Sequence, residues 1–363
     1  MKKQVLKAGL VMAATLGMSA PAMAQANPIN FDFYIDTYYA IDTDTTMDIG
    51  TDGNQDLVPK KDRGLNAIGY RNNEFNLNTA QMTVSTEQEM YRGRFTMQYG
   101  TIPISSWSGG YLNIQEANLG FRPAADLGGE GNNIWIDGGI FLTHIGNELL
   151  LPRENWLSTL ALVTMFEPFY QSGVKVGYNW GEMFSGELHV LNSYGTIEDN
   201  NADKSLGWLL SYNPMDNLGL SWAGLVGNEQ DAGATAQLRL YNNVNLNYQI
   251  LDQFGVRGQI DVANEAGNLY YGAQLSARYD IFDQFGVTVR GETIQDPQGI
   301  LTDNLQGYGI TLGLEYKPTE KSFVRLEGRQ LIMDANNNQI FMDAQGNTSS
   351  NRSELLINTG IWF

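Results

Sequence analysis

The sequence predicts an all-β fold, an antiparallel up-and-down transmembrane β-barrel of about 16 strands with long outer loops and short periplasmic turns. Three observations predict it. The chain begins with an export signal, side-chain polarity alternates residue by residue along most of the remaining chain, and short connections alternate with long ones. Together these features are typical of bacterial outer-membrane barrels.

Composition excludes several other classes of protein. The 363 residues carry 22 Lys and Arg against 40 Asp and Glu, a net charge of −18, with no Cys and only 2 His. A disulfide scaffold and a thiolate metal site are therefore excluded, and so acidic a chain would repel the phosphates of a nucleic acid. We expect no nucleic-acid partner, no metal and no cofactor.

The first 24 residues have the three parts of a signal peptide. Lys2, Lys3 and Lys7 form a basic start, 8–18 is apolar, and 22–24 (AMA) is a cleavage site of the small-x-small type. The alternative, a membrane anchor, needs about 20 uninterrupted apolar residues, and this run is too short. We expect cleavage, leaving 25–363 as one transmembrane barrel domain.

Strands are expected wherever apolar and polar residues alternate, because successive side chains of a strand point to opposite faces. In 306–317 one face is wholly apolar, from Tyr308 to Tyr316, and the other carries Thr311, Glu315 and Lys317. The same reading gives 16 segments, an even number, as a single-chain bacterial barrel requires. They are 30–41, 72–86, 92–100, 111–121, 133–142, 168–180, 183–192, 205–213, 217–227, 234–251, 254–264, 268–280, 285–295, 306–317, 321–332 and 352–363.

The connections sort by length onto two sides of the predicted barrel. With a periplasmic N-terminus, the long ones (42–71, 101–110, 143–167, 193–204, 296–305 and 333–351) all fall outside the cell. The connection 122–132 is longer than a periplasmic turn should be. Strand 72–86 changes parity near Thr79, which indicates a β-bulge.

A soluble β-sandwich would also alternate, so the aromatic residues decide between the two folds. Aromatic side chains on the outward register near the periplasmic ends predict a membrane-interface girdle. They are Phe121, Tyr178, Trp180, Phe184, Tyr212, Phe254, Tyr279, Phe285, Tyr316, Phe323 and Phe363. The apolar last strand ending in Phe363 is similar to the terminal signal that the barrel assembly machinery recognises, so we expect that machinery as a partner.

The middle of the chain resembles the putative β-barrel porin-2 (OmpL-like) family of Gram-negative outer membranes. The resemblance rests on 77–82 (LNTAQM), 139–148 (GIFLTHIGNE), 168–174 (PFYQSGV) and 199–204 (DNNADK), with Asn155 and Asn192. It implies a pore in the cell outer membrane, reached through the periplasm. The family's solute is generally unassigned, so the resemblance implies none.

The inward register places charged residues of both signs in the lumen. The expected pore-lining basic residues are Arg92, Arg94, Lys175, Arg239, Arg257, Arg278, Arg290, Arg325 and Arg329. The expected pore-lining acidic residues are Asp32, Asp36, Glu116, Asp137, Glu187, Asp261, Glu292, Glu315 and Glu327. We expect the arginines of the C-terminal strands to form a basic wall facing an acidic patch, which would set a field across the pore. Alternatively, these charges pair across strands, as Arg290 would with nearby Glu292 and Arg325 with Glu327, and fill a plugged interior.

The connection 143–167 is the candidate constriction loop. It carries Glu148, Arg153 and Glu154, followed by the apolar stretch 157–166. An apolar loop is unfavourable in water, so folding into the barrel mouth would bury it and bring these charges to the narrowest point. The alternative is an outward loop that packs at a subunit interface.

The remaining chemistry is sparse. Asp334 begins a pattern like a calcium loop, but Gln339 and Gln345 replace the required glycine and glutamate, so a solvated loop is expected. His189 lies beside Glu187 on one strand face and His144 opens the constriction loop, without a hydrolase motif near either. A catalytic role is therefore disfavoured.

We expect a porin that allows passive diffusion of small hydrophilic solutes or ions, and no enzyme. Acidic outer loops favour a cation bias at low salt, whereas lumenal arginines favour anions. The alternatives are a plugged structural or adhesive barrel and, behind them, an outer-membrane hydrolase. Outer-membrane lipid and lipopolysaccharide are expected partners, the latter bridged by divalent cations, and a homotrimer is a further possibility.

Overall fold

The fold is described from a computed structural model that covers residues 29–49, 55–107, 109–123, 134–336 and 339–363. The expected signal peptide, 1–24, lies outside these residues. So does most of the connection 122–132.

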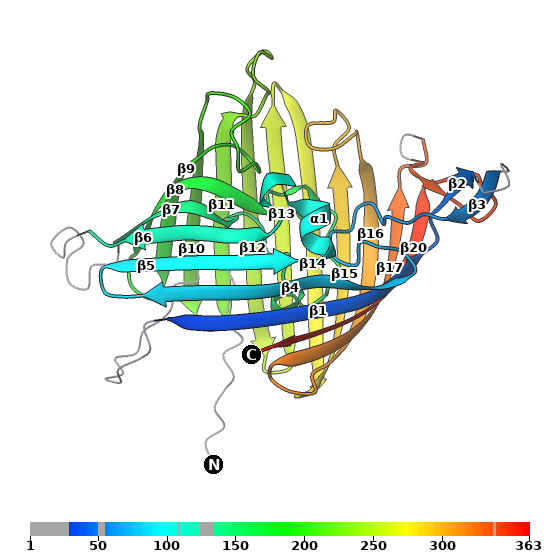
Figure 1. Ribbon diagram of the computed structural model, residues 1–363, viewed down its shortest axis with the longest axis horizontal. Helices are drawn as coiled ribbons and strands as arrows, with labels where there is room; N and C mark the ends of the chain where they lie inside the picture. Colours follow the sequence, from blue (N-terminus) through cyan, green and yellow to red (C-terminus); the bar gives the residue numbers. More distant parts are fainter. Residues whose placement is uncertain (1–28, 50–54, 108, 124–133, 337–338) are drawn as a thin grey trace.

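Sixteen antiparallel strands form a closed barrel, as the alternation predicts (Figure 1). Each pairs with its sequence neighbours, and the first strand pairs with the last to close the sheet. They are β1 (Asn30–Asp42), β4 (Glu74–Glu87), β5 (Tyr91–Tyr99), β6 (Ile114–Phe121), β7 (Ile134–Leu142), β8 (Tyr170–Asn179), β9 (Phe184–Leu191), β10 (Ser205–Met215), β11 (Leu218–Asn228), β12 (Leu238–Leu251), β13 (Phe254–Glu265), β14 (Asn268–Phe282), β15 (Phe285–Gln295), β16 (Gln306–Tyr316), β17 (Ser322–Met333) and β20 (Asn351–Trp362).

The other elements belong to connections. Two small sheets, β2 (Thr45–Ile49) with β3 (Gln55–Pro59) and β18 (Phe341–Met342) with β19 (Thr348–Ser349), lie beyond the end of the barrel wall (Figure 1). Helix α1 (Thr101–Ser106) follows β5, and single 3-10 turns occupy Gly109–Tyr111, Pro152–Glu154 and Thr164–Phe166. Within the described residues, the helices are all too short or too polar to cross a membrane.

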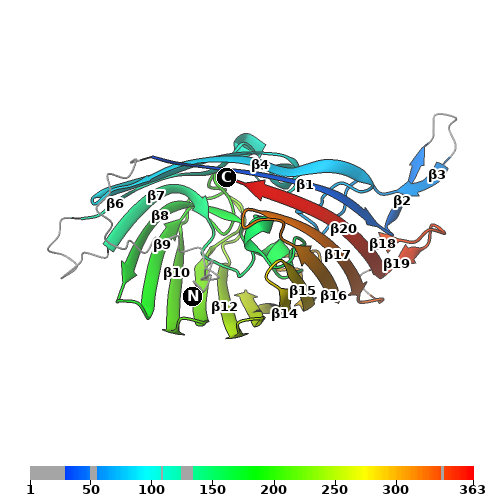
Figure 2. The same ribbon diagram turned by 90° about the horizontal axis from the view of Figure 1, so that it is seen from below.

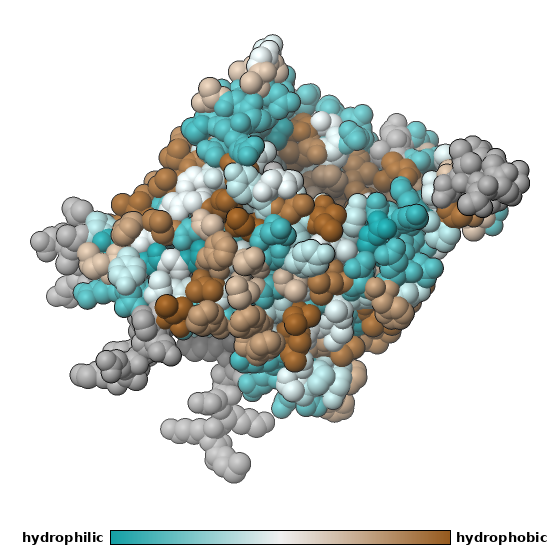
Figure 3. Space-filling model, in the orientation of Figure 1, coloured by the Kyte–Doolittle hydropathy of each residue, from teal (hydrophilic) through white to brown (hydrophobic). Residues whose placement is uncertain are grey.

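The barrel wall separates an apolar outer face from a polar interior. On β16, Tyr308, Ile310 and Leu312 are exposed, while Thr311 and Glu315 at the alternate positions are buried inside. Brown, apolar residues accordingly spread over the outside of the strands, and teal residues gather over the loops (Figure 3). This outer face is what a hydrocarbon environment requires, because a closed barrel leaves no unpaired strand edge.

One residue assigned to the outer aromatic girdle is placed wrongly by the sequence reasoning. Phe323 is 1% exposed and lies inside the barrel, where it packs with Tyr34 and Leu151. Phe323 faces inward because it lies two residues before Arg325 on the same strand, and residues two apart point to the same face. The guanidinium of inward-facing Arg325 lies 4.2 Å from the ring centre of Phe323.

The predicted bulge in 72–86 is confirmed. Asp36 of β1 pairs with Thr79, whereas the next residue, Thr37, pairs with Leu77, so Asn78 is the extra residue. Its side chain turns into the interior, where it donates to Asp36 at 2.7 Å and accepts from the Gly69 amide at 2.8 Å. The bulge therefore ties the wall to the outer loop that precedes β4.

Figure 2 shows that the barrel is not round. A flatter side carries β1, β4 and β6, and a strongly curved side runs from β8 through β17. The connection from β7 to β8 enters the space between them and contacts interior side chains of β15 and β17. Most buried apolar side chains belong to clusters formed where the long connections meet the interior face.

Candidate functional site

The connection between β7 and β8, residues 143–169, folds into the barrel and is called the inner loop. Its apolar side chains Leu157, Leu160 and Leu162 are buried. Their burial needs space on the wall, which Gly313 of β16 provides, since a Cβ there would lie 2.3 Å from a Leu157 methyl carbon. A loop with an apolar stripe thus finds a covered surface inside the barrel rather than in water.

Arginines of the wall hold the backbone of the inner loop. Arg325 of β17 donates to the carbonyls of Pro152 and Asn155, each at 2.6 Å. Arg290 of β15 donates to Glu148 at 3.0 Å and to the Thr159 carbonyl. Carbonyls and amides without secondary-structure partners are costly to bury, and these contacts satisfy them.

Carboxylates of the wall complete the attachment. Glu327 accepts hydrogen bonds from the amides of Ser158 and Thr159, and Glu292 accepts one from the Leu162 amide at 2.6 Å. Charged residues on β15 and β17 therefore fix the first part of the apolar stretch of the inner loop, from Ser158 to Leu162.

Four arginines of the expected basic wall, those of β14, β15 and β17, are neutralised by this arrangement, whereas Arg257 of β13 has no ion pair among the described residues. Arg278 and Arg325 share Glu315, and Arg329 pairs with Glu292 at 2.8 Å. The side chain of Arg290 is 0% exposed and lies 3.7 Å from Glu292. The alternative of cross-strand pairing describes these residues better than an open basic wall, although Arg325 pairs with Glu315 and not with Glu327.

The other predicted lumenal charges lie on the interior register outside the anchoring strands. Their ion pairs are Arg92 with Asp137, Arg94 with Glu116, Lys175 with Glu187, Arg239 with Glu265, and Asp32 with Arg153 of the inner loop. Water reaches this region, since the side chains of Arg94 and Asp32 are 32% and 41% exposed.

Two predicted acidic residues sit in hydrogen-bonded networks instead of ion pairs. Asp36 accepts from Tyr34 and Asn78 and is fully buried. Asp261 accepts from Tyr241 and Asn243 and is also fully buried. Neither faces open water.

Titratable groups hold both ends of the inner loop. His144 stacks on His189 with ring centres 4.0 Å apart, and its Nε2 donates to the Gly224 carbonyl at 2.9 Å. Burial, reinforced by His189, lowers the pKa of His144 to about 3. At the other end burial raises the pKa of Glu167 well above its ordinary range, with neighbouring Asp261 adding to the effect.

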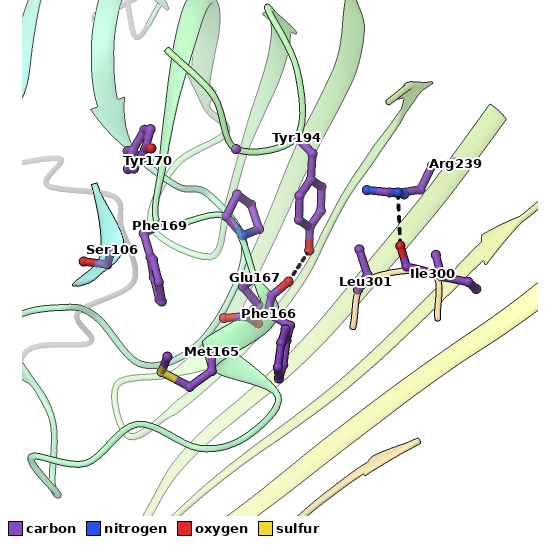
Figure 4. A pocket seen from close by; sticks show the side chains of 12 residues that line it. Ser106, Met165, Phe166, Glu167, Phe169, Tyr170, Tyr194, Arg239, Ile300 and Leu301 are labelled. Carbon is purple, nitrogen blue, oxygen red and sulfur yellow. Dashed lines mark hydrogen bonds between the residues drawn. The ribbon is translucent and has the colours of Figure 1, made fainter. Parts of the chain in front are cut away.

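A cavity of about 310 Å³ opens beside the end of the inner loop (Figure 4). Phe166, Phe169 and Tyr194 supply aromatic walls, and Arg239 closes one side by donating to the Ile300 carbonyl at 3.3 Å. The Tyr194 hydroxyl donates to the Phe166 carbonyl at 2.9 Å. Nothing in the alternation of the sequence pointed to this cavity, because most of its lining comes from connections.

Sequence reasoning also missed a buried network at the outer mouth. Arg63, from the connection before β4, donates to Asp42 at 3.2 Å and to Glu354 at 2.9 Å. Arg352 joins the same group from β20. The alternation of the last strand indicates that Arg352 and Glu354 point inward. No pattern in the sequence indicates an interior position for Arg63.

Neither histidine forms a catalytic site. His189 Nε2 lies 3.0 Å from Glu187, yet His189 is 2% exposed and covered by His144. Among the residues that the structure describes, no group of three or more His, Cys, Asp or Glu side chains could hold a metal ion.

Solved structures with this fold are outer-membrane proteins. OmpT of Vibrio cholerae is 12% identical, with 94% of this chain and 99% of that chain covered and a TM-score of 0.55. The anion-selective porin from Comamonas acidovorans is 11% identical, with 92% and 99% covered and a TM-score of 0.56. The channel DcaP of Acinetobacter baumannii is 11% identical, with 92% and 97% covered and a TM-score of 0.55. At these identities the likeness concerns the fold.

Sequence comparison assigns the family. No curated protein matches the chain. The model of the family described as putative beta-barrel porin-2, OmpL-like, matches residues 28–363, almost the whole chain outside the expected signal peptide. The resemblance found in the sequence is thereby confirmed, and the chain belongs to this family of outer-membrane β-barrel porins.

Proposed function

We propose that this porin lets small hydrophilic solutes and ions diffuse passively through the part of the lumen that the inner loop leaves open. One observation carries the proposal: charged side chains on the interior face remain exposed to water beside the loop. Arg94 and Asp32 are examples, and Glu154 at the tip of the loop is 28% exposed. A polar, wet path through a closed barrel permits diffusion without chemistry. As a member of a porin family, the protein is a channel rather than an enzyme.

The inner loop is proposed to set the size limit. Arg153 reaches Asp32 at 2.8 Å and also contacts Glu154, so the tip of the loop presents charge near β1. Glu148 is proposed to act differently, because its contacts with Arg290 and the Ala161 amide hold the loop. Passage is then limited by the width beside Arg153 and Glu154, and by their charge.

Selectivity is proposed to depend on salt. Acidic residues in the outer loops, among them Glu198, Asp199 and Asp203, together with the net charge of −18, attract cations to the outer mouth at low ionic strength. Salt screens such exposed charges over about 10 Å at 0.1 M. The cation bias should therefore weaken as salt is raised.

We propose three kinds of partner: further copies of the chain, the lipids of the outer membrane and the barrel assembly machinery. A Vibrio cholerae OmpT structure is described as a trimer form, which supports a homotrimer here. Outer-membrane lipid would cover the apolar outer face, and lipopolysaccharide would meet the acidic loops through bridging cations. Phe363 follows the last strand and stacks on Phe33, with ring centres 5.4 Å apart. We propose that the barrel assembly machinery recognises this end of the chain.

A plugged structural or adhesive barrel is the competing function. It is favoured by the depth at which the inner loop is anchored, with Arg290 at 0% and Arg329 at 1% side-chain exposure beneath it. Such anchoring would also fit a permanent plug. The two functions differ in whether solutes pass.

Swelling of vesicles that contain the refolded barrel distinguishes them. In isotonic solutions of neutral sugars of increasing size, a diffusion channel gives swelling rates that fall as the sugar grows. Vesicles carrying the heat-unfolded protein are the matched control. A folded barrel that admits not even the smallest sugar would exclude the channel and support the plugged barrel.

A further inference from the structure

Arg257 of β13 differs from the other basic residues predicted for the lumen. The other eight each form an ion pair with a carboxylate. Among the residues that the structure describes, no carboxylate lies within ion-pairing distance of Arg257. Its guanidinium instead lies over the ring of Trp156, 4.4 Å from the ring centre. From this contact, and resting on the proposed channel function, we infer that Arg257 and Trp156 form a subsite for the carboxylate group of small organic anions.

The contact with Trp156 leaves the hydrogen-bond donors of Arg257 to other partners. The guanidinium carbon lies over the indole ring, and such a contact uses the charge of the guanidinium and none of its N–H groups. An arginine edge matches a carboxylate in a two-point contact, and stacking on an indole holds it in place for that contact. Arg257 is half-buried and lies on the inward register of β13, which directs its side chain toward the lumen.

The wall around Arg257 is built to carry this pair. Gly255, two residues earlier on the same face, makes room for the indole, since a Cβ there would lie 3.1 Å from a Trp156 ring carbon. Asn247 of β12 and Ser276 of β14 stand directly opposite Arg257 in the strand register. Side chains at such positions face the same side of the sheet as Arg257, so polar groups flank it on both neighbouring strands.

Nearby carboxylates are already committed elsewhere. Glu148 bonds Arg290 and the Ala161 amide, and Glu154 bonds Arg153. Arg278, whose charge also acts on Arg257, is held by Glu315. The charge of Arg257 is therefore left for an anion in the lumen to balance. Pairing in the wet lumen removes less water from the two charged groups than pairing in a dry interior would, so its desolvation cost is lower.

The proposed subsite lies beside the tip of the inner loop, on the inner face of β13. Within four residues the inner loop contacts β1, through Arg153 and Asp32, and β13, through Trp156 and Arg257. Five strands separate β1 from β13 around the barrel. The tip of the loop therefore bridges the lumen, and Arg257 stands at one side of the gap it leaves.

The test is block of potassium chloride current by benzoate in planar bilayers that hold the full refolded barrel. Arg257→Gln should weaken benzoate block about tenfold or more, as expected from loss of a charged hydrogen-bond donor. Trp156→Phe should retain most of the block and Trp156→Leu should lose it, because the ring face is the required element. Lys61→Gln removes the same charge from an exposed site in the outer connection before β4 and should leave block unchanged.

The outcomes separate this inference from the proposed channel. A folded wild type that never conducts overturns the channel itself. A wild type that conducts, with equal benzoate block in Arg257→Gln and Lys61→Gln, overturns the subsite alone. If Arg257→Gln fails to fold, Arg257→Lys takes its place. It keeps the charge but not the two-point edge, and it should lose benzoate block while chloride current persists; unchanged block would overturn the inference.

Discussion

Arg290 illustrates what the interior charges do in this barrel. Its side chain is completely buried and contacts Glu148 and Thr159 of the inner loop and Thr311 of β16. An arginine so placed does not line a water path. It fastens a connection to the wall, and it is tolerated there because carboxylates and carbonyls surround it.

Arg290→Gln should therefore destabilise the protein by about 3–5 kcal/mol, because it leaves the buried carboxylate of Glu148 without its partner. Urea unfolding of the barrel in lipid vesicles measures this free energy. Lys321→Gln, at an exposed periplasmic turn, is the control and should change it by less than about 0.5 kcal/mol. Equal, small effects in both variants would mean that Arg290 does not anchor the loop.

At the scale of elements, strand alternation was a sufficient guide to the wall. All 16 barrel strands are where alternation places them, with shifts at the ends such as β12, which begins at Leu238 rather than at 234. Period-two patterning works because one face meets an apolar surrounding and the other does not. The parity change near Thr79 was readable for the same reason.

Pairing between charges was not readable to the same degree. Proximity along the strand suggests Glu327, two residues away, as the partner of Arg325. In the structure Arg325 pairs with Glu315, which stands directly opposite in the register of β16 with β17. That register is fixed by the short turn between Tyr316 and Ser322, so the partner of Arg325 lies across the hairpin and is not found by spacing along one strand. The contributions of Arg63 and Trp156 depend on how connections fold, and were missed for that reason.

A disulfide can test the position of the inner loop, because the chain has no cysteine of its own. The Ser158 hydroxyl contacts the Asn358 side chain of β20, 200 residues away in sequence. Ser158→Cys combined with Asn358→Cys should form a bridge on oxidation, seen as a mobility shift on a non-reducing gel. Ser158→Cys combined with Ser353→Cys, at an exposed position of β20, is the control. Crosslinking of the control alone would contradict an inner position.

Glu167 gives the attachment of the inner loop a dependence on pH. Its pKa in the folded protein is raised above the ordinary 4.5, so the folded state binds the proton more tightly than the unfolded chain does. Its contribution to stability is complete below pH 4.5 and is lost as pH rises through the raised value. Glu167→Gln should remove this loss, so the thermal midpoint should fall less with rising pH than in the wild type. Parallel curves for the two proteins would contradict the assignment.

For the whole molecule, a closed wall and an inner loop together imply a narrow, polar passage. The wall is closed by β1 and β20, and the inner loop touches it on β1, β13, β15 and β17. The outer mouth is acidic, whereas Arg257 of the proposed subsite lies deeper in the barrel. Selectivity for cations at low salt should therefore decline toward higher salt, because exposed charges are screened more strongly than partly buried ones.

Single-channel recording from the refolded protein in planar bilayers under a potassium chloride gradient tests the central claim most directly. For a passive porin we expect stable, discrete open steps and, at low salt, a reversal potential whose sign indicates selectivity for cations. Verified folded barrels that insert yet stay silent would contradict the claim and leave a plugged structural barrel as the better account.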